Sequence, residues 1–283
     1  MDDRTGMESL GATSLGIAFA RAQESRRPDR LFDDPYAERF LAAGADVWPM
    51  NQAMTGGGSR AAADVWTFLL HQVAVRTRFF DDYFAVAGAE GCRQAVLVAA
   101  GLDARGVRLP WPRGVRVFEL DQGSVLAFKD RVLAGAAPPA GVERVPVAVD
   151  LREEWAGALV AAGFDPGRPS TWLIEGLFPA LTHEQSDRLL TRVSELAAPG
   201  SRLAYDDTGE VALVHPMLHQ LDPILVELYK GGPVGDTVAW LADHGWEAEV
   251  LDHADVALRY GRPAMEPEAG SWPHARLVRA RRV

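Results

Sequence analysis

The sequence contains a single cysteine and no long apolar run, and each absence excludes a class of protein. Cys92 is the only cysteine among 283 residues, which rules out an internal disulfide and a zinc site built from several thiolates. No stretch is apolar for long enough to span a bilayer, and the acidic start Met1-Asp2-Asp3-Arg4 does not suit a signal peptide. We therefore expect a soluble, cytoplasmic protein without a bound metal.

Basic side chains are scarce relative to acidic ones. The chain has 29 lysine and arginine residues and 39 aspartate and glutamate residues, which gives a formal net charge of -10, and the basic residues form no basic block. An acidic surface without a basic stripe repels phosphate backbones, which argues against nucleic acid as the main partner. With 48% hydrophobic and 24% charged residues, the composition is that of an ordinary globular protein. We expect a small-molecule partner, and the oligomeric state stays open.

The N-terminal zone, up to about residue 89, has the apolar spacing of helices. Helices are expected over 14–24 and 61–87. Between them, Asp33-Asp34-Pro35-Tyr36 predicts a helix start, with an acidic cap and proline in the first turn. The glycine-rich run 55–59 is expected to be a loop.

From about residue 94 to 207, short apolar runs alternate with helical patterns, which is typical of βα units around a mostly parallel sheet. Thr182-His183-Glu184-Gln185 predicts a capping box at one helix start. The last zone predicts a helix over 234–244 and a closing antiparallel pair, an ending that the dinucleotide-binding fold does not normally have. The expected strands are 95–99, 116–120, 144–149, 171–174, 202–205, 246–251 and 275–280, and the middle helices are 124–134, 154–162 and 182–197.

The first expected strand runs directly into a tight turn at Gly101. A residue without a side chain lets the backbone approach a ligand, and such a turn at the carboxyl end of a strand is where α/β sheets bind nucleotides. The alternative is that Gly101 serves only to end the strand.

Acidic residues close the next three strands. Glu119 and Asp121 follow the glycine turn by about 20 residues, where a carboxylate can accept hydrogen bonds from both ribose hydroxyls. The alternative for these two is a solvated strand end, with Asp121 capping the following helix. Asp150 with Leu151 offers an acceptor and an apolar face that suit adenine, and Glu175 ends the fourth strand before a glycine.

Five segments together resemble the leucine carboxyl methyltransferase family: 76–82, 100–105, 118–121, 149–152 and 175–176. The N-terminal segments 20–24 and 34–38 resemble its actinobacterial branch. The resemblance implies an α/β fold, a class I methyltransferase Rossmann-like seven-stranded sheet with an N-terminal helical cap. It also implies a division into a cap over residues 1–90 and an S-adenosylmethionine-binding methyltransferase domain over residues 91–283.

The resemblance also implies roles for individual residues. Arg76 would pair with the carboxylate of S-adenosylmethionine, since a guanidinium is planar and permanently charged, unless it forms only a surface salt bridge. Gly101 would approach the methionine portion, and Asp121 would bind the ribose. Asp150 and Leu151 would contact the adenine, while Glu175 would lie near the amino group or the sulfonium.

Further residues complete the expected cofactor site. Arg78, Asp103 and Arg105 are expected helpers, or else Asp103 forms an ion pair with an arginine and holds the turn. The family often carries one more glycine before Gly101, where this chain has Ala99-Ala100.

The implied activity is methyl transfer to an oxygen, carboxylate or hydroxyl, of a small-molecule acceptor, including specialised metabolites. A carboxylate needs no base, whereas a hydroxyl usually needs one. Two alternatives stay open: a nicotinamide-dependent oxidoreductase, for which a fuller glycine fingerprint and a catalytic tyrosine or lysine are missing, and a non-catalytic nucleoside-binding protein. The candidate bases are His183, His215, His219, Asp206 and Asp207, and candidate pocket or core residues are Trp48, Met50, Met54, Trp66, Met217, Leu218, Leu221, Leu225, Leu228 and Tyr229.

Overall fold

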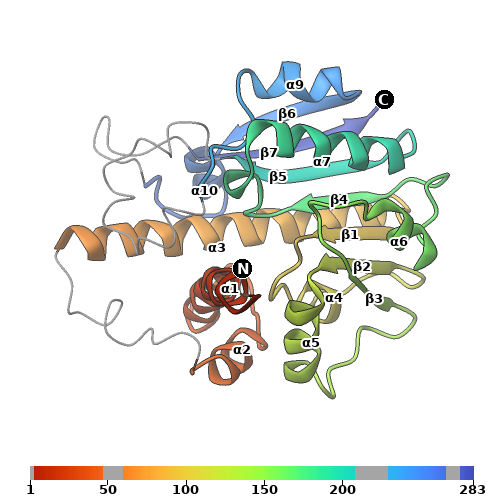
Figure 1. Ribbon diagram of the computed structural model, residues 1–283. Helices are drawn as coiled ribbons and strands as arrows, with labels where there is room; N and C mark the ends of the chain where they lie inside the picture. The colour runs from red at the N-terminus through yellow and green to blue at the C-terminus, as the bar shows by residue number, and fades with distance from the viewer. Residues whose placement is uncertain (1–2, 47–59, 208–228, 266–274) are drawn as a thin grey trace.

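The computed structural model describes residues 3–46, 60–207, 229–265 and 275–283 (Figure 1). Its centre is a seven-stranded sheet with the order β3-β2-β1-β4-β5-β7-β6. The strands are β1 (Gln94–Val98), β2 (Arg116–Asp121), β3 (Glu143–Ala148), β4 (Thr171–Ile174), β5 (Arg202–Asp207), β6 (Trp246–Asp252) and β7 (Arg276–Arg282).

The first five strands are parallel, and β7 runs antiparallel between β5 and β6. The predicted seven-stranded α/β sheet and its closing antiparallel pair are confirmed. Because β1 to β5 are parallel, their carboxyl ends meet at one edge of the sheet.

Helices cover both faces of the sheet, as the alternating side chains of β1 require. Val96 and Val98 pack toward α6, α7 and α9, whereas Ala95 and Leu97 pack toward α3 and α10. The helices are α1 (Asp3–Ser25), α2 (Ala37–Ala43), α3 (Arg60–Ala89), α4 (Arg105–Arg108), α5 (Gly123–Val132), α6 (Ala156–Ala161), α7 (His183–Leu196), α9 (Thr237–Asp243) and α10 (His253–Arg259), with a 3-10 turn over Phe178–Ala180. No helix within these ranges is long and apolar enough to cross a membrane.

Local signals at helix starts were predicted with mixed success. The capping box at α7 is confirmed, since Thr182 Oγ1 accepts from the Gln185 amide at 3.3 Å and Gln185 Oε1 accepts from the Thr182 amide at 2.9 Å. The predicted acidic cap of α2 is wrong. Asp34 Oδ1 instead accepts from the Tyr36 amide in a turn before the helix, and α2 begins only at Ala37 without a side-chain cap.

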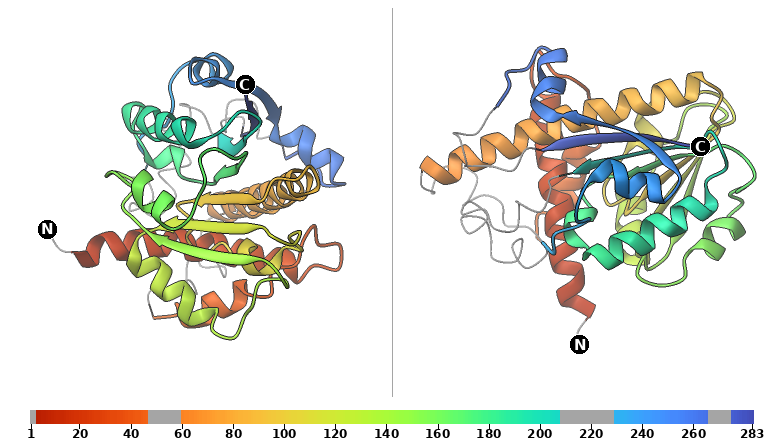
Figure 2. Two further views of the ribbon diagram at one scale, coloured as in Figure 1. Left: turned by 90° about the vertical axis from the view of Figure 1, so that its right-hand side faces the viewer. Right: turned by 90° about the horizontal axis from the view of Figure 1, so that it is seen from above.

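The N-terminal helices pack at the carboxyl edge of the sheet. α1 crosses α3 at a steep angle (Figure 2), and Leu15 of α1 packs with Phe40 of α2 and Leu133 beyond α5. α3 also belongs to the sheet's own core, where Phe80 and Phe84 are buried. The division of the chain after residue 90 stays a proposal. Trp48, Met50, Met54 and the predicted loop 55–59 lie outside the described residues.

Candidate functional site

The turn after β1 has an unusual backbone for its sequence. Both Ala99 and Gly101 have positive φ, 53° and 46°, a region that glycine adopts freely and alanine does not. A Cβ on Gly101 would lie only 3.1 Å from the Ser14 hydroxyl oxygen on α1. A side chain at position 101 would therefore require Ser14 to give way by a few tenths of an ångström, so the turn favours glycine for space as well as for conformation.

Asp121 lies beside this turn, at the end of β2. Its Oδ2 accepts from the Gly101 amide at 2.6 Å, and its Oδ1 accepts from the Gln122 amide at 2.7 Å. Burial raises the pKa of the Asp121 carboxyl, although these two hydrogen bonds act in the opposite direction. A carboxylate has about four lone-pair sites, so two acceptor positions remain for a ligand.

Glu175, directly after β4, accepts hydrogen bonds from three guanidinium groups. Oε1 accepts from Arg21 Nη2 and from Arg76 Nε, both at 3.1 Å, and Oε2 accepts from Arg105 Nη1 at 2.7 Å. Burial alone would raise the pKa of Glu175, but Arg105, Arg21 and Arg76 together hold it well below its usual range. Glu175 is therefore a permanent negative charge at the centre of the edge.

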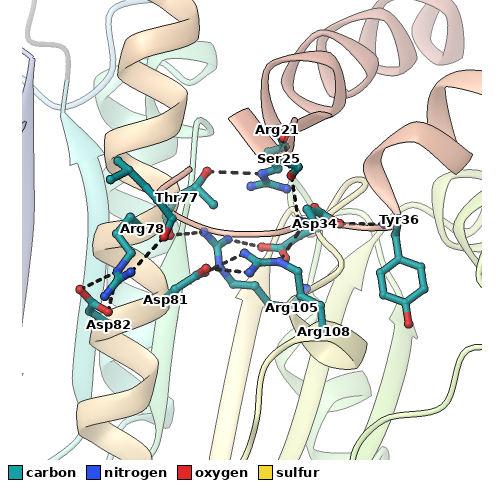
Figure 3. A network of polar contacts seen from close by, with 12 residues as sticks. Arg21, Ser25, Asp34, Tyr36, Thr77, Arg78, Asp81, Asp82, Arg105 and Arg108 are labelled. Carbon is teal, nitrogen blue, oxygen red and sulfur yellow. Dashed lines mark hydrogen bonds and ion pairs between the residues drawn. The ribbon is translucent and has the colours of Figure 1, made fainter. Parts of the chain in front are cut away.

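Arg105 lies beneath the turn and is fully buried. Its guanidinium pairs with Asp81 of α3 at 2.7 Å and with Asp103, and it donates to the Thr77 carbonyl at 3.2 Å (Figure 3). Burial lowers the pKa of Arg105, but Asp103, Glu175 and Asp81 raise it far more. The predicted ion pair between Asp103 and an arginine is present. Its position indicates that Asp103 and Arg105 support the turn.

A second ion pair lies between β4 and β5. Arg76 Nη1 is 2.8 Å from Asp206 Oδ2, and Asp206 Oδ1 accepts from the Gly176 amide at 2.6 Å. Burial raises the pKa of Asp206, against the influence of Arg76. No hydrogen bond from Arg76 Nη2 occurs within the described ranges, and this nitrogen lies 3.7 Å from where a Cβ on Gly176 would stand.

Asp150 and Leu151 follow β3 at the same edge. The Val149 amide donates to the Asp121 carbonyl at 2.9 Å, which fixes this strand end beside β2. Asp150 Oδ1 accepts from the backbone amide and the Nε of Arg152, both at 2.9 Å, and this hydrogen bonding lowers the pKa of Asp150. Leu151 is partly buried against the core. The fold brings both residues to the predicted edge.

Glu119 has a different environment from Asp121, although both side chains lie on the same face of β2. It is fully buried, with Oε2 2.9 Å from Lys129 Nζ and 2.7 Å from Arg144 Nη2. These partners hold α5 and β3 against β2. We therefore assign Glu119 to the support of the sheet and leave it out of the proposed cofactor contacts. Arg78, the other expected helper, pairs with Asp82 at 3.0 Å along α3 and donates to the Leu31 carbonyl.

Arg21 is a site residue that sequence reasoning missed. It lies in the segment 20–24 that carries the family resemblance, but a helical arginine gives no sign of its partner. The fold places it in contact with Glu175 and, through Nε at 3.4 Å, with the Thr77 hydroxyl (Figure 3).

The candidate bases are scattered. Asp206 belongs to the site, whereas Asp207 pairs with Arg276 at 2.6 Å and accepts from the Thr237 hydroxyl. His183 Nδ1 accepts from the Val234 amide at the exposed start of α7. His215 and His219 lie outside the described residues, as do Met217, Leu218, Leu221, Leu225 and Leu228. Tyr229 is described, and burial together with neighbouring Asp206 raises the pKa of its hydroxyl.

Known proteins resemble this chain in sequence and in fold. Residues 14–194 match the leucine carboxyl methyltransferase family. The chain is 46% identical over 272 residues to a Parafrankia protein, covering 94% of this chain and 86% of that one. It is also 41% identical over 290 residues to a Mycobacterium leprae protein, covering 98% and 94%. The names of both relatives describe S-adenosyl-L-methionine-dependent methyl transfer.

Solved structures agree on the fold. A DUF574 family protein from Streptomyces avermitilis gives a TM-score of 0.58 at 13% identity, over 96% of this chain and 97% of the other. A methyltransferase-type structure from Thermobifida fusca gives 0.52 at 20% identity, over 93% and 94%. The oxidoreductase alternative is set aside. The chain thus belongs to the leucine carboxyl methyltransferase family and is an S-adenosyl-L-methionine-dependent methyltransferase with a class I fold.

Proposed function

We propose that the enzyme transfers the methyl group to an oxygen atom of a small-molecule acceptor, with the cofactor held at the carboxyl edge of the sheet. The observation that supports this position of the cofactor is the contact between Asp121 and the Gly101 amide. It sets a carboxylate with spare acceptor positions beside a turn that has no side chain.

The residues of the edge fit the parts of S-adenosylmethionine. Asp121 would accept from the ribose hydroxyls, and Asp150 with Leu151 would receive the adenine. Arg76 Nη2 would donate to the cofactor carboxylate, and the permanently ionised Glu175 would favour its positive groups. Arg21 and Arg105 would act through Glu175, because their guanidiniums hold its carboxylate in place.

The bound cofactor supplies an electrophilic methyl group on a sulfonium, and the chain's own residues orient the partners and exclude water. The family's name refers to a carboxyl group, which is methylated at oxygen. A carboxylate acceptor is already a nucleophile. A hydroxyl acceptor would need a proton acceptor, and Asp206 is the described carboxylate best placed for that role, since it lies at the site and burial raises its pKa.

Calorimetric titration with S-adenosylmethionine and with its demethylated product tests the cofactor site. Asp121→Ala should weaken binding at least tenfold, and Asp243→Ala, at an exposed aspartate at the end of α9, should leave it unchanged. Equal binding by wild type and Asp121→Ala would refute the assignment.

Acceptor chemistry is tested by supplying a panel of carboxylic acids and phenols with cofactor and measuring the demethylated product. A methyl ester product releases methanol in mild base, whereas a methyl ether does not. Transfer only to nitrogen or sulfur acceptors, or only to macromolecules, would contradict the proposal.

A further inference from the structure

A hollow of about 260 Å³ lies at the opposite edge of the sheet, where the parallel strands begin. It is separate from the cofactor edge, because its walls come from the C-terminal end of α3, the start of β1, the loop before β4, the start of β5 and the end of β7. In Figure 1 the end of α3 and the C-terminus lie at this side of the sheet. We call it the amino-edge hollow.

Four arginines from four different parts of the chain line the amino-edge hollow: Arg93, Arg168, Arg202 and Arg281. Glu90 is the one carboxylate among the lining residues, so four positive charges face one negative charge, an excess of three. The whole chain carries a net charge of -10, so this excess does not follow from the overall composition. It is a local feature of the fold.

Two of these arginines are fixed in place by the protein. Arg93 Nη1 donates to the Gly88 carbonyl at 2.8 Å and to the Cys92 carbonyl at 3.0 Å. Arg202 forms an ion pair with Glu90. These contacts use Nη1 of Arg93 and Nη2 of Arg202, so each guanidinium keeps further N–H donors for another ligand.

The other two, Arg168 and Arg281, are exposed, and no hydrogen bond or ion pair of their side chains occurs within the described ranges. Arg281 lies directly opposite Arg202 in the antiparallel pair of β7 and β5, so the two side chains emerge on the same face. On its other side Arg281 lies opposite Glu247 of β6, whose carboxylate offsets part of the positive charge there.

We propose that the amino-edge hollow binds a phosphate group, either as a free oxyanion or on a small phosphorylated metabolite. The planar fork of arginine matches phosphate oxygens in a bidentate manner, and the excess of arginines over carboxylates in the lining suits a multiply charged anion. The volume admits a group of this size together with a small organic portion. This site does not depend on the methyl acceptor proposed above.

The test uses the full chain and titrates inorganic phosphate, pyrophosphate and ribose 5-phosphate by calorimetry at constant ionic strength, with chloride as the balancing anion. Saturable binding is expected, weakened at least tenfold in Arg281→Gln and in Arg168→Gln. The matched control is Arg279→Gln, since Arg279 lies on the same strand but pairs with Glu249 outside the hollow. Binding in that control should stay within twofold of wild type.

Tighter binding of ribose 5-phosphate would identify a metabolite, and tighter binding of inorganic phosphate would identify the free oxyanion. The proposal fails if no probe saturates, or if Arg279→Gln weakens binding as much as Arg281→Gln. It also fails if citrate binds as tightly as pyrophosphate, or if pyrophosphate competes with S-adenosylmethionine, because the anion would then occupy the cofactor edge. The exposed variants should keep the wild-type melting temperature.

Discussion

The Gly101 amide donates a hydrogen bond to Asp121 Oδ2 at 2.6 Å, joining the turn after β1 to the end of β2. One carboxylate thus fixes the backbone of the turn and still offers acceptor positions to a ligand. Loss of this carboxylate should affect cofactor binding more than it affects folding, because Asp121 is only partly buried at the end of its strand.

Asp121→Asn should therefore lower the affinity for S-adenosylmethionine by tenfold or more. The asparagine side chain has an NH2 donor where aspartate has a second acceptor oxygen. That donor would face the hydrogen of the ribose hydroxyl or of the backbone amide that the oxygen had accepted. Calorimetry measures the affinity, and the melting temperature monitors the fold. Unchanged affinity would show that the ribose binds elsewhere.

Ala99→Gly should be neutral or should stabilise the protein by up to about 1 kcal/mol. Glycine removes the steric cost of positive φ, roughly 1–2 kcal/mol, but adds up to about 1 kcal/mol of unfolded-chain entropy. Ala100→Gly is the matched control, because Ala100 is buried and lacks the positive φ. Denaturant unfolding should show that the control loses about 1 kcal/mol. Equal losses in both variants would contradict the strain at Ala99.

Glu175→Gln should destabilise the enzyme by about 3 kcal/mol, because it leaves three buried guanidiniums without their shared charge. The folded-state pKa of Glu175 lies below its unfolded value of 4.5, so its contribution is present above pH 4.5 and is lost as the pH falls below it. Wild-type stability should fall more steeply than that of the variant below pH 4.5 in denaturant titrations. Stability profiles of wild type and variant that run parallel below pH 4.5 would show that ionised Glu175 does not stabilise the fold.

His253 should lower the stability of the protein as the pH falls, and this loss should begin at a higher pH than the loss that involves Glu175. Burial, with smaller contributions from His71 and Arg76, lowers the pKa of His253 to about 4 from its ordinary 6.5. The unfolded chain therefore takes up a proton between pH 6.5 and 4 that the folded chain does not, and stability falls by up to about 3 kcal/mol as the pH drops through this window.

His253→Asn should flatten the stability profile between pH 6.5 and 4, which chemical denaturation at several pH values would measure. A wild-type profile that is already flat in this window would show that His253 is not held neutral by the fold.

Local patterns in the sequence were sufficient for the sheet and for part of the site. The capping box depends on Thr182 and Gln185, three residues apart, and such interactions need no tertiary partner. The positions of Gly101, Asp121 and Asp150 at strand ends follow from apolar runs of limited length, and parallel strands bring those ends to one edge.

Only the tertiary structure decided which charged residues meet. Glu119 and Asp121 are two positions apart on one strand, yet Lys129 and Arg144 bury the first while the Gly101 turn receives the second. Arg21 contacts Glu175 across 154 residues of chain, a pairing that no local pattern encodes. The periodicity of the sequence shows which face of a helix or strand is apolar. Each buried ion also requires a compensating neighbour. Which residue fills that role depends on the elements that the fold brings together.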